Sequence, residues 1–170
     1  MHPLEMFTHC PVCGSSRFVV NTVKSKHCSD CSFTYYANPS AATAAFILRG
    51  GCLLVARRAN EPAKGTLDLP GGFVDMDETA EEGVRREIRE ETALEVSTLR
   101  YLFSLPNLYE YSGMTIHTLD MFFSVEVAPD AQPQADDDAA ELQWIPLEDI
   151  QPEKFGLASI RKAVELFLKR

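Results

Sequence analysis

Apolar residues gather in short runs that predict five strands in the larger, C-terminal part of the chain. Two of these runs fill residues 41–58 and are separated by Gly50-Gly51, a dipeptide that tolerates the positive φ values of a tight hairpin. Three further runs follow at residues 97–109, 117–127 and, in shorter form, 141–147.

Helical periodicity appears in two segments, one between the second and third of these strands and one after the last. Residues 79–93 read as a helix in which Thr79 caps the first turn and Glu82, three residues later, completes a capping box. Val84 and Ile88 are spaced to face the core. A closing amphipathic helix is predicted from the apolar positions Ile160, Val164, Leu166, Phe167 and Leu168. Strands on both sides of one strong helix, with another helix at the end, predict an α/β layered sandwich.

Length and composition limit the number of domains and the compartment. With 170 residues, 45% of them hydrophobic, the chain can build one full core and a small appendage. Because a long apolar run and signal-peptide features are both missing from the sequence, we expect a soluble, cytoplasmic protein without membrane contact. The net charge of −9 argues against broad capture of nucleic acid, and any phosphate-bearing substrate would need divalent cations between it and the protein.

Four of the five cysteines form two Cys-x-x-Cys pairs with the spacing of a metal site. They follow the pattern C-x2-C-x14-C-x2-C at Cys10, Cys13, Cys28 and Cys31. Two tight turns with this spacing can close a tetrahedron of thiolates around Zn2+. Free thiols in loops and a redox-active dithiol are alternatives that fit the pattern less well. His9 and His27 adjoin the cysteines and could compete as ligands, although four sulfurs suffice.

The turn signal Asn38-Pro39-Ser40 separates the cysteine-rich segment from the rest of the chain. We therefore expect a zinc ribbon at residues 1–38, followed by the main domain at residues 39–170. A ribbon of this size cannot bury enough apolar surface without its metal, so the expected role of zinc is structural. The ribbon could also help a homodimer to form.

Three glutamates of the helix at 79–93 have the spacing of a metal site. Glu90 and Glu91 share one face of the helix with Glu87 because they follow it by three and four residues. Such like charges destabilise a bare helix by a few tenths of a kcal/mol per pair, and a divalent cation reverses that penalty. Hard Mg2+ prefers such oxygen ligands while also binding substrate phosphates. The alternative is a charged face that is simply solvated.

The residues around these glutamates resemble the Nudix box, G-x5-E-x7-R-E-U-x-E-E-x-G-U, in which U is aliphatic. The matching positions are Gly72, Glu78, Arg86, Glu87, Ile88, Glu90, Glu91 and Leu94. Ala93 departs from the pattern, which has glycine there because glycine accepts the left-handed backbone that ends a helix. Residues 39–170 thus resemble a Nudix hydrolase domain, and the resemblance implies an α/β/α sandwich with a mixed sheet.

The Nudix resemblance also implies the chemistry. Water would attack a phosphorus of the pyrophosphate in a nucleoside diphosphate that is linked to another moiety. Glu87, Glu90 and Glu91, with the main-chain carbonyl of Gly71, would bind the catalytic Mg2+ or Mn2+, with Glu90 as the most indispensable ligand. Arg86 would pair with Glu78 and brace the loop against the helix. The general base stays open between Glu91, Glu90 and an acidic residue of the segment 136–141.

A ribbon joined to a Nudix domain is similar to the NADH pyrophosphatase group, which carries an SQPWPFP-like signature after its box. Here residues 104–113 read SLPNLYEYSG and lack its tryptophan and second proline pair. Tyr109 and Tyr111 alternate as on a strand and could stack a base or ribose of the substrate, or could simply pack. Three other aromatic residues are predicted to belong to the core, namely Phe122, Phe123 and Trp144.

Two classes of function compete in the sequence. The first is a metal-dependent pyrophosphohydrolase of small nucleotides, with ADP-ribose and NADH as first candidates. The second is a binding module that senses a nucleotide while the ribbon contacts RNA or protein through Arg17, Lys24 and Lys26, a small basic group. A nucleotide-capped RNA end as the substrate would unite the two, and the sequence leaves RNA binding open.

Overall fold

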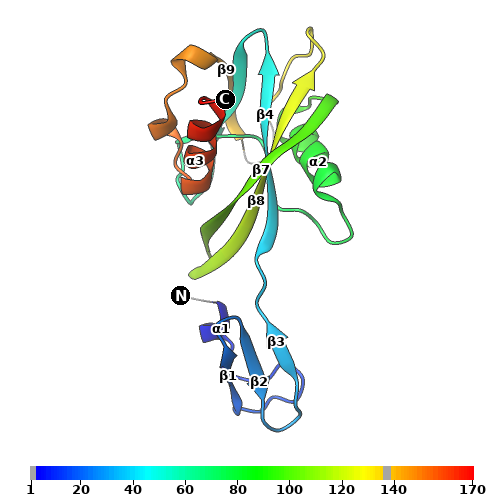
Figure 1. Ribbon diagram of the computed structural model, residues 1–170, viewed down its shortest axis with the longest axis vertical. Coiled ribbons are helices and arrows are strands. Elements are labelled where there is room, and N and C mark those ends of the chain that lie inside the picture. Colours follow the sequence, from blue (N-terminus) through cyan, green and yellow to red (C-terminus); the bar gives the residue numbers. More distant parts are fainter. Residues whose placement is uncertain (1–2, 136–138) are drawn as a thin grey trace. The chain divides into compact units, whose positions relative to one another are not determined.

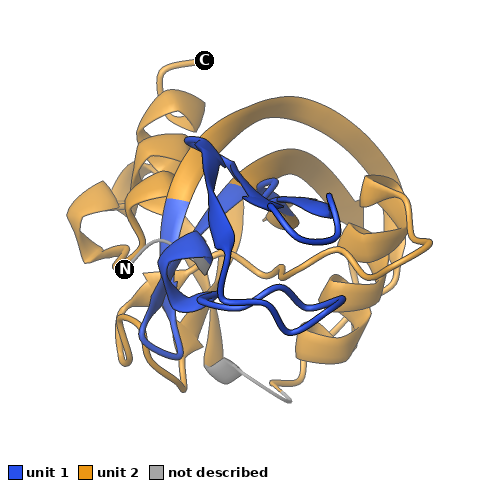
Figure 2. Ribbon diagram, turned by 90° about the horizontal axis from the view of Figure 1, so that it is seen from below, with its two compact units in different colours: residues 1–40, 108–118 blue, residues 41–107, 119–170 orange. Residues whose placement is uncertain are grey.

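The computed structural model describes residues 3–135 and 139–170, and its internal contacts divide the chain into two units (Figure 2). The first unit consists of Met1–Ser40 together with Leu108–Thr118, and the second of Ala41–Asn107 with Leu119–Arg170. The expected domain boundary after residue 38 stays a prediction. Within the described ranges, no helix has both the length and the apolar composition needed to cross a membrane.

The N-terminal segment of the first unit folds into a short helix and a small antiparallel sheet. Its elements are α1 (Pro3–Met6), β1 (Phe18–Thr22), β2 (Ser25–Cys28) and β3 (Thr34–Tyr36), and the strands lie in the order β1-β2-β3. Its core cluster contains Cys10, Phe18 and Cys28, with Phe33 packed against them. So small a core leaves much of the stability of this segment to its cysteine cluster.

The second unit is built around a six-stranded sheet in the order β6-β5-β4-β8-β7, with β9 also paired to β5. β5 runs antiparallel to β4, β6 and β9, whereas β4 and β8 point the same way in Figure 1, so the sheet is mixed, as expected. The strands are β4 (Ser40–Arg49), β5 (Cys52–Arg58), β6 (Leu67–Asp68), β7 (Val96–Tyr111), β8 (Met114–Val127) and β9 (Ala139–Pro146).

Helices cover both faces of this sheet. α2 (Ala80–Thr92) and α3 (Ala158–Phe167) lie on opposite sides of it in Figure 1, and the short 3-10 helices η1 (Leu147–Asp149) and η2 (Pro152–Lys154) precede α3. Val84 and Ile88 of α2 are fully buried, as their spacing predicted. Burying each such side chain contributes roughly 1.5–3 kcal/mol. The α/β class and the sandwich of helix, sheet and helix are therefore confirmed.

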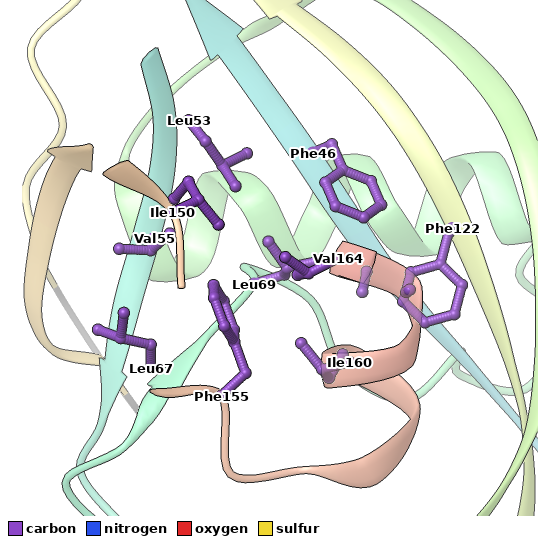
Figure 3. Close-up of a cluster of buried hydrophobic side chains, with 12 residues drawn as sticks. Phe46, Leu53, Val55, Leu67, Leu69, Phe122, Ile150, Phe155, Ile160 and Val164 are labelled. Carbon is purple, nitrogen blue, oxygen red and sulfur yellow. The ribbon is translucent and has the colours of Figure 1, made fainter. Parts of the chain in front are cut away.

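Alternation along the strands separates two hydrophobic cores. Phe46 of β4 and Phe122 of β8 belong to the cluster under α3, part of which is drawn in Figure 3. Their neighbours Ile47 and Phe123 point to the other face and pack with α2. Phe122 and Phe123 are core residues, as predicted, while Trp144 of β9 is half-buried against the α2 cluster.

β7 and β8 form a longer hairpin than the predicted strands at 97–109 and 117–127. The strands continue to Tyr111 and begin again at Met114, so only Ser112 and Gly113 remain as the turn. Both turn residues have positive φ, 49° and 75°, which is typical of a two-residue hairpin turn. The polar segment between the two apolar runs therefore extends the strands instead of forming a loop.

The ends of α2 follow the predicted signals. Thr79 accepts a hydrogen bond from the backbone N–H of Glu82, and the Glu82 carboxylate accepts one from the backbone N–H of Thr79. At the other end Ala93 takes the left-handed conformation, with φ 56° and ψ 18°. The cap expected of glycine thus forms on alanine, and the cost is backbone strain.

Replacing Ala93 by glycine is expected to stabilise the protein by roughly 0.5–1 kcal/mol, because glycine adopts the left-handed cap without the steric cost of a Cβ. Equilibrium urea unfolding would measure the change. Ala93→Val is the matched control and should destabilise, since a β-branched side chain tolerates positive φ least. Equal stability of the glycine and valine variants would contradict the assigned cap.

Candidate functional site

The guanidinium group of Arg86 connects the carboxylates of α2 to the loop that precedes the helix. Its Nε and Nη2 donate to the two oxygens of Glu78 at 3.0 and 2.9 Å, and Nη2 also donates to the carbonyl of Phe73 at 3.0 Å. Nη1 donates to Glu87 at 2.8 Å and to Glu90 at 3.0 Å. The structure therefore forms the expected Arg86–Glu78 brace, and the same guanidinium holds two of the proposed metal ligands.

These contacts change the titration of the groups involved. Hydrogen bonds from Arg86, followed by one from the backbone N–H of Asp75, hold the pKa of Glu78 below its usual value. The hydrogen bonds to Glu78, Glu87 and Glu90 in turn raise the pKa of Arg86, so this cation stays charged. Burial raises the pKa of Glu87, and Arg86 offsets part of that effect. A further cation near the Glu87 carboxylate would therefore offset part of its desolvation cost.

Two glycines allow the preceding loop to approach both the carboxylates and β4. A Cβ on Gly72 would lie 2.5 Å from Oε1 of Glu87, and one on Gly71 would overlap the backbone at Thr43. Gly71 also has a φ of +148°, which favours glycine, and its N–H donates to Oε2 of Glu91 at 2.9 Å. The Gly71-Gly72 turn is thus in direct contact with two of the three proposed ligands.

The structure gathers the expected site residues on one side of α2 without bringing all their oxygens together. Glu87 and Glu90 share one nitrogen of Arg86, whereas Glu91 is turned to Gly71. In the described part of the chain, the four cysteines are the one group of three or more ligand residues whose donor atoms all lie within 4.8 Å of one another. The metal-binding roles of the three glutamates and of the Gly71 carbonyl stay predictions.

The segment proposed as an alternative source of the general base is described only at its end. Residues 136–138 lie outside the described residues, and Glu141 forms an ion pair with Arg57 at 3.2 Å.

Two contacts of the site had no signal in the sequence. The carbonyl of Phe73 accepts from Arg86 through the main chain, and Asp75 lies 3.6 Å from the same guanidinium in a loop without periodicity.

The four cysteines form a closed cluster in the first unit. The Sγ atoms of Cys10 and Cys31 are 3.6 Å apart, as are those of Cys13 and Cys28. A tetrahedron with bonds of about 2.3 Å to a central zinc ion has edges of about 3.8 Å, so the sulfurs fit that geometry. The expected cluster of four cysteines is present, and its donor set could hold a metal ion.

The surroundings of the cysteines hold the two neighbouring histidines outside the group. A backbone hydrogen bond from Cys31 is the largest influence on the Cys28 thiol and lowers its pKa to about 7, whereas burial and the neighbouring thiols raise the pKa of Cys31 to about 12. His27 Nδ1 lies 2.9 Å from the hydroxyl of Thr34, and His9 Nδ1 lies 2.9 Å from that of Thr8. Neither histidine belongs to the group of mutually close donor atoms found in the described residues.

Tyr109 and Tyr111, the candidate stacking residues, lie at the tip of the β7–β8 hairpin. By its contacts this tip belongs to the first unit, whereas the glutamates belong to the second. Tyr111 is 60% exposed and Tyr109 is half-buried. A role for either side chain in substrate binding stays a prediction.

Comparison with known proteins decides the family. A model of the NUDIX domain matches residues 38–167. The chain belongs to the Nudix family. An ADP-ribose pyrophosphatase of Methanocaldococcus jannaschii is 34% identical over 132 residues, which cover 76% of this chain and 75% of that protein. The NAD-capped RNA hydrolase NudC of Pseudomonas entomophila is 27% identical over 161 residues, 95% of this chain.

Solved structures of Nudix hydrolases share the fold of this chain. A Nudix hydrolase of Nitrosomonas europaea superimposes with a TM-score of 0.74 at 19% identity, covering 95% of this chain and 90% of that one. A MutT Nudix hydrolase of Burkholderia pseudomallei gives 0.65 at 26% identity, covering 75% and 97%. The Nudix chain spans 56% of the length of the NudC relative. Family and relatives together support the expected enzyme class, a Nudix pyrophosphohydrolase.

The Glu78–Arg86 pair makes stability depend on pH in the acid range. Because the folded-state pKa of Glu78 lies below the ordinary 4.5, its stabilisation is complete above about pH 4.5 and is lost as the pH falls through the folded value. Glu78→Gln is therefore expected to lower the free energy of unfolding at pH 7 and to flatten its decline as the pH falls below about 4.5.

Chemical denaturation at several pH values would measure this dependence. Glu81→Gln, an exposed change on the same helix, is the control and should leave the acid slope as it is in the unaltered protein. Parallel curves for Glu78→Gln and the unaltered protein would show that the pair does not contribute.

Proposed function

We propose that the Nudix protein hydrolyses the pyrophosphate bond of a nucleoside diphosphate linked to another moiety, with ADP-ribose as the first candidate substrate. The observation that carries the proposal is the contact between the Gly71-Gly72 turn and the carboxylates of Glu87 and Glu91. It brings the backbone of the turn against two carboxylates, and oxygen ligands of this kind are those that Mg2+ and Mn2+ prefer. The 34% identity to an ADP-ribose pyrophosphatase supports the choice of substrate.

Each residue of the site has a distinct part in this proposal. Glu87, Glu90 and Glu91, with the carbonyl of Gly71, would hold Mg2+ or Mn2+, which would neutralise the pyrophosphate and stabilise the charge that develops on the bridging oxygen. Arg86 keeps Glu87 and Glu90 near each other, because its Nη1 donates to both. Its Nε and Nη2 bind Glu78, so Arg86 would stay in place if Glu87 and Glu90 exchanged Nη1 for a metal ion. The general base stays open between Glu91, Glu90 and an acidic residue of the segment 136–141, of which Glu141 is described.

NADH and a nucleotide-capped RNA end are the alternative substrates. Similarity to NAD-capped RNA hydrolases over 95% of the chain favours keeping RNA as a candidate. The ribbon offers little free positive charge for this purpose. Arg17 forms an ion pair with Asp30, and Lys26 is buried, with its Nζ donating to the carbonyl of Phe7 at 2.6 Å. We therefore favour a free dinucleotide or nucleotide sugar over a long RNA chain.

The cysteine cluster completes the proposal as a structural Zn2+ site. Four mutually close sulfurs and a core of few residues favour a metal that holds the ribbon together without touching the chemistry. Thiolates that must stay reduced favour a cytoplasmic location. A homodimer formed with help from the ribbon also stays part of the proposal.

A substrate panel tests the activity. ADP-ribose, NADH, other nucleoside diphosphate derivatives and a capped RNA are incubated with Mg2+, with Mn2+ and with chelator, and the mononucleotide products are measured. We expect turnover of ADP-ribose that requires the divalent ion. Absence of metal-dependent product from every compound would refute the proposal.

Glu90→Gln tests the ligand assignment, because the amide keeps the shape of the side chain and loses its charge. The variant should fold normally and lose roughly 100-fold or more in kcat, as expected for a group that stabilises the transition state electrostatically. Glu81→Gln, on the exposed side of the helix, serves as the control and should keep full turnover. Full activity of Glu90→Gln would remove Glu90 from the site.

Zinc binding is tested by metal analysis of purified protein. We expect about one equivalent of zinc per chain, its loss in Cys28→Ser, and a lower unfolding temperature of that variant. Cys52→Ser is the matched control, because Cys52 lies on β5 outside the cluster and should leave the zinc content unchanged. Zinc retained in full by Cys28→Ser would rule out the four-cysteine site.

A further inference from the structure

Thr43 of β4 carries a buried hydroxyl group without a hydrogen-bond partner. Its side chain is only 3% exposed, and among the described residues its Oγ1 is one of two buried side-chain polar atoms that lack a partner. The other is the indole nitrogen of Trp144. An unsatisfied buried hydroxyl reduces stability, and valine would fill the same space without that cost. Stability therefore does not explain why a hydroxyl is present at position 43, and a functional role is the alternative.

The strand register places Thr43 opposite Gly72. Residues Ala42 and Phe73 form an antiparallel bridge, and the N–H of Thr43 donates to the carbonyl of Gly72 at 2.8 Å. The flanking bonds, from Ala45 N to Pro70 O and from Val74 N to Ala41 O, keep the same register. Directly opposed residues of an antiparallel pair point to the same face, with Cβ positions about 4.5–5.5 Å apart.

This face is the one that carries the carboxylates. The Cβ direction of Gly72 is occupied by the Glu87 side chain, whose Oε1 would lie 2.5 Å from a Cβ built there. Ala45, two residues after Thr43 on β4, packs in the cluster under α2 and so identifies the same face. The Thr43 side chain thus points to the same face as the Glu87 carboxylate, and Gly72 is the common neighbour of both. A water molecule in contact with both groups would give Oγ1 of Thr43 its missing partner.

We propose that Thr43 is a positioning residue whose hydroxyl orients the water molecule that attacks the pyrophosphate, an inference that rests on the proposed function. The water donates one hydrogen to Oγ1 of Thr43 and the other to a carboxylate of the site, which leaves an oxygen lone pair to face phosphorus. A bond from the water oxygen to phosphorus forms, and the bond from phosphorus to the bridging oxygen breaks. The bridging oxygen keeps the electron pair, and the carboxylate takes the proton.

Three substitutions separate this role from packing. Thr43→Val keeps the shape and removes the hydroxyl, whereas Thr43→Ala and Thr43→Ser are a smaller pair that differ only by the hydroxyl. With ADP-ribose and Mg2+, we expect kcat of the valine and alanine variants to fall tenfold or more, with KM changed by less than about twofold. Thr43→Ser should keep kcat within about threefold of the unaltered protein. The unfolding midpoint of Thr43→Val should equal or exceed that of the unaltered protein.

The outcomes distinguish the inference from the proposed function. If the unaltered protein hydrolyses ADP-ribose and the valine or alanine variant does so with unchanged kcat, the role of Thr43 is refuted and the proposed function stands. A rise in KM without a fall in kcat would make Thr43 a substrate-binding residue and would equally overturn the inference. If the unaltered protein has no activity on any compound of the panel, both fail together. If Thr43→Val does not fold, the kcat values of Thr43→Ala and Thr43→Ser are compared instead, and equal values would refute the role of the hydroxyl.

Discussion

The antiparallel pairing of residues 70–74 with β4 is the contact on which the site depends. The hydrogen bonds from Thr43 to Gly72, from Ala45 to Pro70 and from Val74 to Ala41 fix the turn against the edge of a buried strand. Glycine is required at 71, where a Cβ would overlap the backbone of β4, and at 72 a Cβ would displace the Glu87 carboxylate. Once the turn is fixed, α2 can lie close enough for its carboxylates to reach backbone groups. The same pairing that completes the sheet therefore sets the spacing of the site.

Arg86 resolves the electrostatic conflict that this spacing creates. Glu78, Glu87 and Glu90 gather around a single cation that is four-fifths buried, and their mutual repulsion is offset by its hydrogen bonds. Both carboxylate oxygens of Glu78 accept hydrogen bonds from Arg86, so this pair is held at two points. Glu87 and Glu90 instead share the Nη1 atom of Arg86. A brace of this kind holds the loop in place while two carboxylates can still exchange partners.

The sequence predicted those features that depend on local spacing. The helix over 79–93, its capping box and its buried residues Val84 and Ile88 follow from periodicity and cap chemistry, and the cysteine cluster follows from its spacing. It could not show that Thr43 lies opposite Gly72, because register between distant segments depends on the assembled sheet. The left-handed cap expected of glycine forms on Ala93, whose N–H donates to the carbonyl of Arg89.

The two proposed metal sites differ in how far the protein forms them in advance. The cysteine sulfurs already lie at the spacing of a tetrahedron, and Cys10 and Cys28 are part of a core that has few other members. A metal there adds directly to folding stability. The glutamates instead keep protein partners, Arg86 for two of them and Gly71 for the third. Under the proposal, an ion at α2 would compete with these contacts and would be exchangeable, so that it could arrive with a phosphate-bearing substrate, whereas an ion held by the four cysteines would be retained.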